Sequence, residues 1–331
     1  MNEFSYARPA TIDDAFTILE SRGIDPQEQT VLAGGTDLLT LIKGGISTPH
    51  QLIDIKRLPE LDSQISMTDD GLRIGALATL AQVQNDPLVV TTHPALAQAA
   101  AVAATPQLRH MATIGGNLLQ NPRCWYFRSR DVSCWRKGGD SCPAADPEGE
   151  NQYHALFGDG PCYAVHPSDP ATALLALNAL VRVRDSQGER SVSLEDFFTL
   201  PTEGHRQEHQ LRPDNLITAI EIPSPAPASR SAYFKVMDRA VWAFALVGAA
   251  AQIAVEDGVV TSARLVLGGV APIPWRVPAA EAVVIGNAPS PEMFARAADV
   301  ALDGAKPLAK NGYKIELAKR LVERAMTAAT E

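Results

Sequence analysis

The sequence predicts an α+β fold divided between two domains. Its 331 residues exceed one domain of ordinary size, which has roughly 150. Short strand-like and helix-like segments follow one another along the chain, and the proline-rich stretch 223–227 separates two groups of them as a linker would. We therefore expect one domain over residues 1–225 and a second over residues 226–331.

The composition is that of an ordinary globular protein, since 46% of the residues are apolar and 20% are charged. The net charge of −9 argues against binding to nucleic acid or to an anionic membrane, because both attract basic surfaces. The longest nearly apolar run, 242–255, is too short to span a bilayer and is expected as a buried strand or helix. The N-terminal residues contain no apolar signal region, so we expect folding in the cytoplasm.

The first 55 residues predict a small β-α-β unit. A helix is expected over Thr11–Arg22, because Thr11 is a suitable N-cap and Gly23 follows the end. A strand over Gln29–Ala33 then leads through a Gly-Gly turn into a helical turn over Asp37–Lys43. A further strand is expected over Gln51–Ile55.

The rest of the chain predicts further short elements around one irregular segment. In the first domain we expect strands over 72–74, 181–184 and 216–222, helices over 80–84, 93–104 and 171–180, and a loop at 113–117. In the second domain we expect strands over 233–236, 243–255 and 264–270 and helices over 290–303 and 314–328. Residues 122–163 show neither the strand nor the helix period, which is unusual for this length unless something staples the segment.

Two glycine turns are candidate binding loops. Gly34-Gly35-Thr36-Asp37 follows an apolar strand, and successive amides in such a turn can form an anion-binding nest. Thr113-Ile-Gly-Gly-Asn117 is a second turn of the same type. Taken alone, each is more often an ordinary tight turn, in the second case with Asn117 capping the next segment. Two such turns in one domain favour a ligand as long as a dinucleotide, which needs donors from two loops.

All four cysteines fall within the irregular segment, as Cys124, Cys134, Cys142 and Cys162. An iron–sulfur cluster, a zinc ion or two disulfides could explain them. Disulfides are rare in the cytoplasm, and zinc sites usually show short Cys-x2–4-Cys spacings that are missing here. Four thiolates suit a [4Fe–4S] cluster, which takes one cysteine per iron, so the cluster is favoured and zinc stays an alternative.

Other side chains of the segment fit a cluster but have simpler explanations. Its five basic residues could stabilise the negative charge of a cluster, or they could form a solvated face; they are Arg123, Arg128, Arg130, Arg136 and Lys137. Its aromatic residues could shield a cluster from water or only pack; they are Trp125, Tyr126, Phe127 and Trp135.

A substrate-activating constellation is missing from the sequence. No Ser-His-Asp arrangement stands out, and His205 with His209 lies in a polar stretch that we expect to be a surface loop and not a zinc site. This absence fits a protein in which a bound cofactor supplies the chemistry.

The glycine motifs occur in the order and context of a known family. Leu32-Ala-Gly-Gly-Thr-Asp-Leu-Leu39 and Ala112-Thr-Ile-Gly-Gly-Asn-Leu118 resemble the two FAD-binding loops of the flavoprotein subunits of molybdenum hydroxylases. Further segments resemble that family in the same order: His166–Pro170 before an Ala/Leu-rich helix, Ile217–Pro223, Tyr233–Arg239, Leu267–Ala271 and Pro274–Arg276. The resemblance covers nearly the whole chain.

This resemblance implies a fold and a cofactor. The fold would be a two-lobed FAD-binding domain of the vanillyl-alcohol-oxidase (PCMH) type, with lobes over about 1–55 and 56–225, followed by a C-terminal α+β domain of the CO dehydrogenase flavoprotein type. The glycine turns would hold the pyrophosphate of FAD, Asp169 its nucleotide part, and Ile217 and Lys235 would lie near the isoalloxazine. The full set expected to contact FAD is Thr30, Val31, Leu32, Ala33, Gly34, Gly35, Thr36, Asp37, Leu38, Thr113, Gly115, Gly116, Asn117, Asp169, Ile217 and Lys235.

The cysteine insertion resembles one branch of the family. Flavin subunits of periplasmic aldehyde oxidoreductase and of 4-hydroxybenzoyl-CoA reductase carry a [4Fe–4S] cluster in such an insertion, and residues 121–127 and 160–169 are more similar to the first. The resemblance implies that Cys124, Cys134, Cys142 and Cys162 bind a [4Fe–4S] cluster. It also leaves the periplasm open as a final compartment, reached with a signal-bearing partner.

The implied function is electron transfer in a heterotrimeric molybdenum hydroxylase that oxidises aldehydes to carboxylic acids. A large partner would hold the molybdenum cofactor, and a small partner with two [2Fe–2S] clusters would pass electrons to this chain. FAD would deliver them to an external acceptor. The alternatives are a 4-hydroxybenzoyl-CoA reductase-like or xanthine dehydrogenase-like complex, a self-sufficient FAD oxidase, and a zinc-stapled assembly protein.

Overall fold

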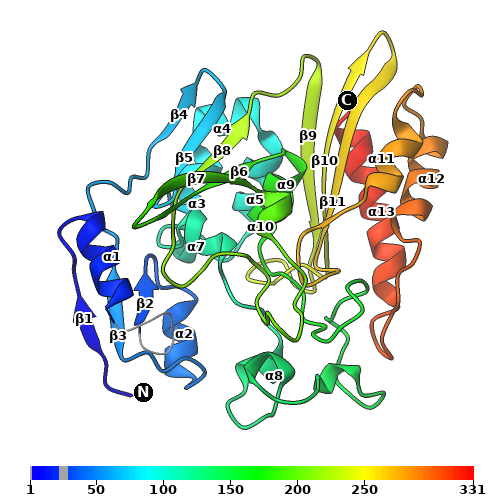
Figure 1. Cartoon of the computed structure of the whole chain (residues 1–331). Helices are drawn as coiled ribbons and strands as arrows, with labels where there is room; N and C mark the ends of the chain where they lie inside the picture. The colour runs from blue at the N-terminus through cyan, green and yellow to red at the C-terminus, as the bar shows by residue number, and fades with distance from the viewer. Residues whose placement is uncertain (1, 22–28) are drawn as a thin grey trace.

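The computed structural model describes residues 2–21 and 29–331, and the strands within these residues form three sheets (Figure 1). The N-terminal lobe holds a parallel sheet of order β1-β3-β2. Its elements are β1 (Ser5–Ala7), α1 (Ile12–Glu20), β2 (Gln29–Leu32), α2 (Leu38–Lys43) and β3 (Gln51–Asp54). The predicted β-α-β unit is confirmed as β2-α2-β3.

Helix α1 begins where the sequence predicts it. The Thr11 hydroxyl accepts a hydrogen bond from the Asp14 amide at 3.1 Å, and the Asp14 carboxylate accepts one from the Thr11 amide at 3.0 Å. This reciprocal capping box satisfies two amides that would otherwise lack a partner. The helix packs Phe16 into the same apolar cluster as Ile53 of β3. The predicted terminating residue, Gly23, lies outside the described residues.

The second lobe is an antiparallel sheet of order β4-β5-β8-β6-β7 with helices on one side (Figure 1). Its strands are β4 (Ile65–Thr68), β5 (Gly71–Gly75), β6 (Leu180–Asp185), β7 (Gly188–Ser193) and β8 (Leu216–Pro223). Its helices are α3 (Leu80–Asn85), α4 (Pro87–Thr92), α5 (Pro94–Val102), α6 (Pro106–Arg109), α7 (Ile114–Leu118), α9 (Asp169–Ala176) and α10 (Leu194–Phe197). Because β8 pairs with both β5 and β6, the last strand of this lobe occupies the centre of its sheet.

The predicted loop at 113–117 is wrong in detail. Thr113 is the N-cap of α7, its hydroxyl accepting a hydrogen bond from the Gly116 amide at 3.2 Å, and Asn117 lies inside this helix instead of capping the next segment. A Gly-Gly pair disfavours a helix by intrinsic propensity. Here the threonine cap and the backbone bonds of Ile114 to Ala78 and of Gly115 to Ala76 override that preference.

The cysteine-rich segment 122–163 is irregular, as predicted. It contains the single turn α8 (Trp125–Arg128) and two 3-10 turns, η1 (Trp135–Lys137) and η2 (Pro143–Ala145). It forms the lower part of the molecule in the orientation of Figure 1. The loop with His205 and His209 packs against it: Trp135 Nε1 donates to Glu203 at 3.0 Å, and Arg136 pairs with the buried Glu208. This histidine stretch is a loop with an exposed tip, as expected, but its other end is held against the cysteine-rich segment.

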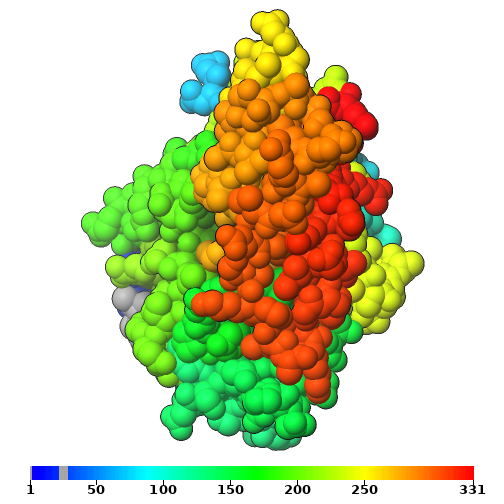
Figure 2. All heavy atoms as spheres, turned by 90° about the vertical axis from the view of Figure 1, so that its right-hand side faces the viewer, coloured from blue at the N-terminus to red at the C-terminus, as the bar shows by residue number. Residues whose placement is uncertain are grey.

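The C-terminal domain is a four-stranded antiparallel sheet of order β12-β11-β10-β9, covered on one face by three helices. Its elements are β9 (Ser229–Val236), β10 (Val247–Glu256), β11 (Val259–Gly268), β12 (Trp275–Arg276), α11 (Pro278–Val284), α12 (Pro291–Ala301) and α13 (Tyr313–Ala328). The opposite face packs on α5 and α9 of the second lobe. Figure 2 shows the C-terminal helices in orange and red directly above the green cysteine-rich segment.

Among the described residues, no helix combines the length and the apolar character needed to cross a membrane.

Candidate functional site

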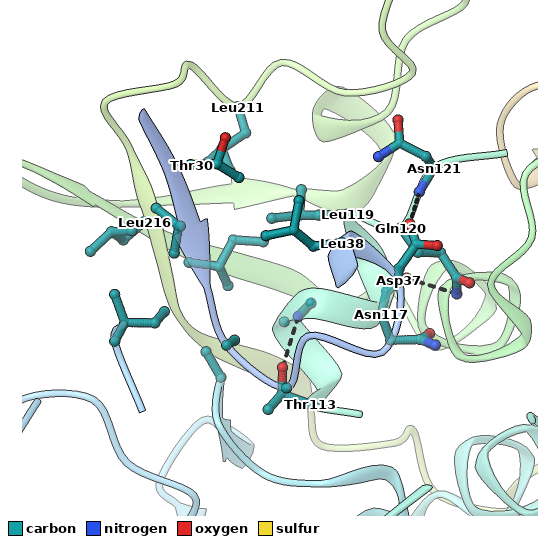
Figure 3. Close-up of a pocket in the computed structure, with 18 of the residues that line it drawn as sticks. Thr30, Asp37, Leu38, Thr113, Asn117, Leu119, Gln120, Asn121, Leu211 and Leu216 are labelled. Atoms are coloured by element: carbon teal, nitrogen blue, oxygen red, sulfur yellow. Dashed lines mark hydrogen bonds between the residues drawn. The ribbon is translucent and has the colours of Figure 1, made fainter. Parts of the chain in front are cut away.

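A cavity of about 320 Å³ lies at the junction of the two lobes of the first domain (Figure 3). One wall comes from β2 and the turn after it, and another from α7 and the residues that follow it. The start of β8 and the loop 207–213 complete it. The Ala76 amide, just after β5, donates to Thr218 O of β8 at 3.0 Å, which holds this end of the sheet against the cavity.

The first glycine turn has the properties of an anion-binding nest. Gly35 has a φ of +70°, a left-handed conformation that favours glycine. Within the described residues, the amide N–H groups of Gly34, Gly35 and Thr36 make no hydrogen bond, although all three residues line the cavity. Three adjacent free donors on a cavity wall fit an anionic group such as a pyrophosphate.

The second glycine turn contributes shape and side chains more than backbone donors. The Gly115 amide donates to Ala76 O at 3.0 Å, and the Gly116 amide donates to the Thr113 hydroxyl at 3.2 Å. The two turns also pack on each other: a Cβ on Gly34 would lie 1.9 Å from the carbonyl oxygen of Met111. Glycine at position 34 is therefore required by the backbone that leads into the second turn.

Most of the residues expected to contact FAD line this cavity. Those that do are Thr30, Val31, Ala33, Gly34, Gly35, Thr36, Asp37, Leu38, Thr113, Gly115, Gly116, Asn117 and Ile217. Leu32 does not; it is buried on the other side of β2 with Ile42 and Leu52, because neighbouring strand residues face opposite ways.

Asp169 and Lys235 lie together, but outside the cavity wall. Lys235 Nζ is 2.8 Å from the Asp169 carboxylate, and the Tyr233 hydroxyl donates to the same carboxylate at 2.6 Å. Both charged side chains are almost fully buried, and burial with the neighbouring carboxylate raises the pKa of Tyr233 well above its usual value. This cluster joins α9 of the second lobe to β9 of the C-terminal domain.

One residue links that cluster to the cavity. Asn117 lines the cavity, and its Oδ1 accepts a hydrogen bond from the Ser168 hydroxyl at 2.5 Å. The same hydroxyl caps α9 by accepting from the Ala171 amide at 3.0 Å. Asp169 is the next residue along the chain, so the second glycine turn sets the position of the buried ion pair.

Several cavity residues were not predicted by the sequence. Arg123 and Arg136 line the wall together with Gln120 and Asn121, as does His209 from the loop expected at the surface. Burial, with smaller effects from Arg136 and His205, lowers the pKa of His209 to about 4. The only sequence signal was the basic character of the cysteine-rich segment, which was compatible with a role beside a cluster or with a solvated face. In the structure Arg123 pairs with Asp37, at 2.9 Å.

The four thiols are free and lie in two adjoining apolar groups. Trp135 packs with Cys162, Cys124 and Cys142, and Phe127 packs with Cys134 and Cys124. Cys124 thus belongs to both groups, and its Sγ lies 3.2 Å from His154 Nε2. Burial, with a smaller effect from Cys142, raises the pKa of the Cys162 thiol to about 12 and that of Cys124 to about 11.

In the part of the chain that the structure describes, no group of three or more His, Cys, Asp or Glu side chains is arranged to hold a metal ion. A tetrahedral zinc site would need sulfur atoms about 3.8 Å apart, given a Zn–S distance of about 2.3 Å. In a four-iron cluster each thiolate bonds a different iron, so the sulfur atoms stand further apart.

The fold and the cavity define a cofactor-binding protein that holds its ligand between two lobes. The FAD binding domain in molybdopterin dehydrogenase matches residues 2–225, and the CO dehydrogenase flavoprotein C-terminal domain matches residues 232–329. The chain therefore belongs to the FAD-binding subunits of the molybdenum hydroxylase family, whose complexes are molybdenum-containing oxidoreductases.

Similar proteins cover almost the whole chain. The aldehyde oxidoreductase FAD-binding subunit PaoB of Escherichia coli (strain K12) is 40% identical over 90% of this chain and 90% of its own length. The nicotinate dehydrogenase FAD-subunit of Eubacterium barkeri is 28% identical over 86% of this chain and 81% of its own. A carbon monoxide dehydrogenase structure from Hydrogenophaga pseudoflava, lacking the Mo-pyranopterin moiety, matches with a TM-score of 0.76 and 27% identity over 99% of this chain and 97% of that chain.

Proposed function

We propose that this chain is the FAD-binding electron-transfer subunit of a heterotrimeric molybdenum hydroxylase that oxidises aldehydes. The observation that carries the proposal is the row of three free amides at residues 34–36 on the cavity wall, within a chain that is 40% identical to an aldehyde oxidoreductase subunit. A large partner with the molybdenum cofactor would oxidise the substrate, and a small partner with two [2Fe–2S] clusters would supply the electrons. When bound, FAD accepts these electrons and gives them to an external acceptor.

Each part of the cavity has a role in this proposal. The amides of Gly34, Gly35 and Thr36 bind the pyrophosphate, with the Asn117 side chain beside them. Ile217 offers an apolar surface to the isoalloxazine. Asp169 and Lys235 act at the far side of Asn117, where they join the FAD-binding domain to the C-terminal domain.

Substitution of Gly34 tests the FAD site. Gly34→Ala places a Cβ 1.9 Å from Met111 O, which forces the two turns apart, so we expect FAD affinity to fall about 100-fold or more. Flavin absorbance after gel filtration measures the loss. Gly204→Ala is the matched control, because a Cβ there meets nothing within 4 Å. Full FAD retention by Gly34→Ala would place the cofactor elsewhere.

We further propose that Cys124, Cys134, Cys142 and Cys162 bind a [4Fe–4S] cluster. In support, four thiols gather in one segment, and Cys124 belongs to both apolar groups that hold the others. Anaerobic purification should yield about four iron and four sulfide per chain, and Cys134→Ser should lose the cluster. One zinc per chain with no iron would reverse this proposal in favour of a structural zinc site.

The heterotrimer is tested with the intact complex. Co-expression with the two partner subunits should give one species with all three chains, and a small aldehyde should bleach its flavin absorbance under anaerobic conditions. A chain that stays monomeric and whose flavin is reduced directly by the aldehyde would instead be a self-sufficient oxidase. Bleaching by a purine but not by an aldehyde would point to a xanthine dehydrogenase-like complex.

A further inference from the structure

The carboxylate of Asp37 connects the first glycine turn to the start of the cysteine-rich segment. Its Oδ1 lies 2.7 Å from Arg128 Nη2 and 2.9 Å from Arg123 Nη2, and its Oδ2 accepts a hydrogen bond from the Asn121 amide at 2.9 Å. Figure 3 shows Asp37 and Asn121 facing each other at the end of the cavity opposite Thr30 and Leu216. One largely buried side chain of the N-terminal lobe therefore contacts three residues that precede or follow Cys124.

The two arginines that bind Asp37 are themselves held in place by hydrogen bonds to residues 120–122 and to Thr40. Arg128 donates to Pro122 O at 2.9 Å, to Asn121 O at 3.0 Å and to the Thr40 hydroxyl at 3.2 Å. Arg123 donates to the Gln120 side chain at 3.2 Å. The loop 120–128 thus folds around two guanidinium groups that both bind one carboxylate oxygen.

Charge explains why the carboxylate is needed. Arg123 and Arg128 repel each other, and burial together with this repulsion lowers the pKa of Arg123 to about 10 although Asp37 opposes the shift. Without the carboxylate, two partly buried cations would face each other with no counter-charge. Removing one partner of such a group usually destabilises the structure around it.

The same residue bears on the cavity. Asp37 follows the free amides of residues 34–36 directly and is the N-cap of α2, where its carbonyl accepts from the Thr40 amide at 3.0 Å. Arg123 lines the cavity, and its buried Nε has no partner among the described residues. A ligand that fixes the turn therefore also fixes the group to which both arginines bind.

We propose that Asp37 is a positioning residue that couples cofactor binding in the cavity to the order of residues 120–128, which carry Cys124. The inference rests on the proposed FAD site and does not require that a cluster is bound. Because coupling between two sites is reciprocal, bound FAD stabilises the loop and an ordered loop strengthens FAD binding.

Hydrogen–deuterium exchange of the full chain, with and without FAD, tests the coupling. In the wild-type chain, FAD should slow amide exchange in peptides covering residues 120–128 by about tenfold or more. In Asp37→Asn, which keeps the size of the side chain but removes its charge, saturating FAD should slow this exchange much less. The Kd for FAD should rise about tenfold in the same variant.

Asp62→Asn is the matched control. Asp62 likewise binds one guanidinium through both oxygens, with Arg73 at 2.9 and 3.2 Å, and accepts from the Gln64 amide at 2.9 Å, but it does not line the cavity. Its Asn variant should keep the wild-type response. Arg128→Gln leaves Asp37 with Arg123 and Asn121 and should give a smaller effect in the same direction, which decides the question if Asp37→Asn does not fold.

Two results would overturn the inference. One is a wild-type chain that binds FAD without any change of exchange in residues 120–128. The other is an Asp37→Asn or Arg128→Gln chain whose response equals that of the wild type. A wild-type chain that binds no FAD at saturating concentration would instead contradict the proposed function itself, so the two failures are distinguishable.

Discussion

The cavity and the cysteine-rich segment adjoin each other but are stabilised differently. The cavity depends on backbone packing, because Gly34 lies against Met111 and the second turn bonds to the end of β5. The described segment contains only short turns, and polar side chains from distant parts of the chain fix its path. The cavity walls formed by the two glycine turns therefore depend on backbone packing, whereas the segment depends on each of its polar contacts and on whatever its thiols bind.

Two buried groups outside the segment hold parts of it. Lys314 of α13 is fully buried and donates to Tyr153 O at 2.9 Å, His154 O at 3.0 Å and Gly269 O at 2.7 Å. Arg136 pairs with Glu208 of the loop 207–213. If the segment and the cavity are stabilised differently, substitutions of Lys314 or Glu208 should destabilise the segment more than the cavity.

The largest effect is expected for Glu208→Gln. This change removes the counter-charge of Arg136, whose side chain is only 7% exposed, and should lower the free energy of unfolding by about 3–5 kcal/mol. Urea denaturation measures it. Glu203→Gln is the control. Glu203 lies on the same loop but is exposed, and the amide oxygen of a glutamine can still accept the hydrogen bond from Trp135. Equal losses in the two variants would show that the buried charge is not the cause.

Lys314→Met should have the next largest effect. The carbonyl groups of Tyr153, His154 and Gly269 would lose the Lys314 donor, and only His154 O would keep a bond, from Asn311 Nδ2, so the change should cost about 3 kcal/mol in the free energy of unfolding. Limited proteolysis should cut residues 122–163 faster while FAD stays bound. Lys319→Met in the same helix should change little, since Lys319 pairs with the exposed Asp299. Simultaneous loss of FAD would contradict the view that the cavity and the segment are stabilised separately, because the two would then unfold together.

Acid should destabilise the chain through His166. Burial lowers the folded-state pKa of His166 to about 3, whereas an unfolded histidine titrates near 6.5. The free energy of unfolding therefore contains the full contribution of neutral His166 above about pH 6.5. This contribution falls as the pH drops towards 3, and at pH 5 it is lower by about 2 kcal/mol. Denaturation of the wild type and of His166→Gln at pH 7 and pH 5 measures it. His110→Gln, at an exposed position, should keep the wild-type pH dependence.

The smallest effect is expected for Lys310→Met. Lys310 Nζ lies 2.7 Å from Glu150 of the segment, but both side chains are largely exposed. Water screens such a pair, so neither the denaturation midpoint nor the rate of proteolysis should change measurably. A clear loss of stability would mean that surface charge, and not only buried polar contact, holds the segment.

Local signals predicted much of the framework. The Thr11 N-cap, the β-α-β unit, three of the C-terminal strands and helices α12 and α13 appear in the structure near the expected residues, whereas β12 and α11 were not predicted. The helix at 114–118 was missed because its glycines disfavour it, and its stability comes from bonds to Ala76 and Ala78 that a local pattern does not contain. Likewise, β7 was not predicted, because most of it is exposed and it has no clear apolar alternation.

The sequence by itself determined the family, the two glycine motifs and the grouping of all four cysteines, because these depend on residue identity and order. Only the tertiary structure decided how they combine. It left the amides of residues 34–36 free but used those of Gly115 and Gly116, and it bound the arginines beside Cys124 to Asp37. The physical reason is that hydrogen bonds and charge pairs form between groups that meet in space, and Asp37 and Arg128 are far apart along the chain.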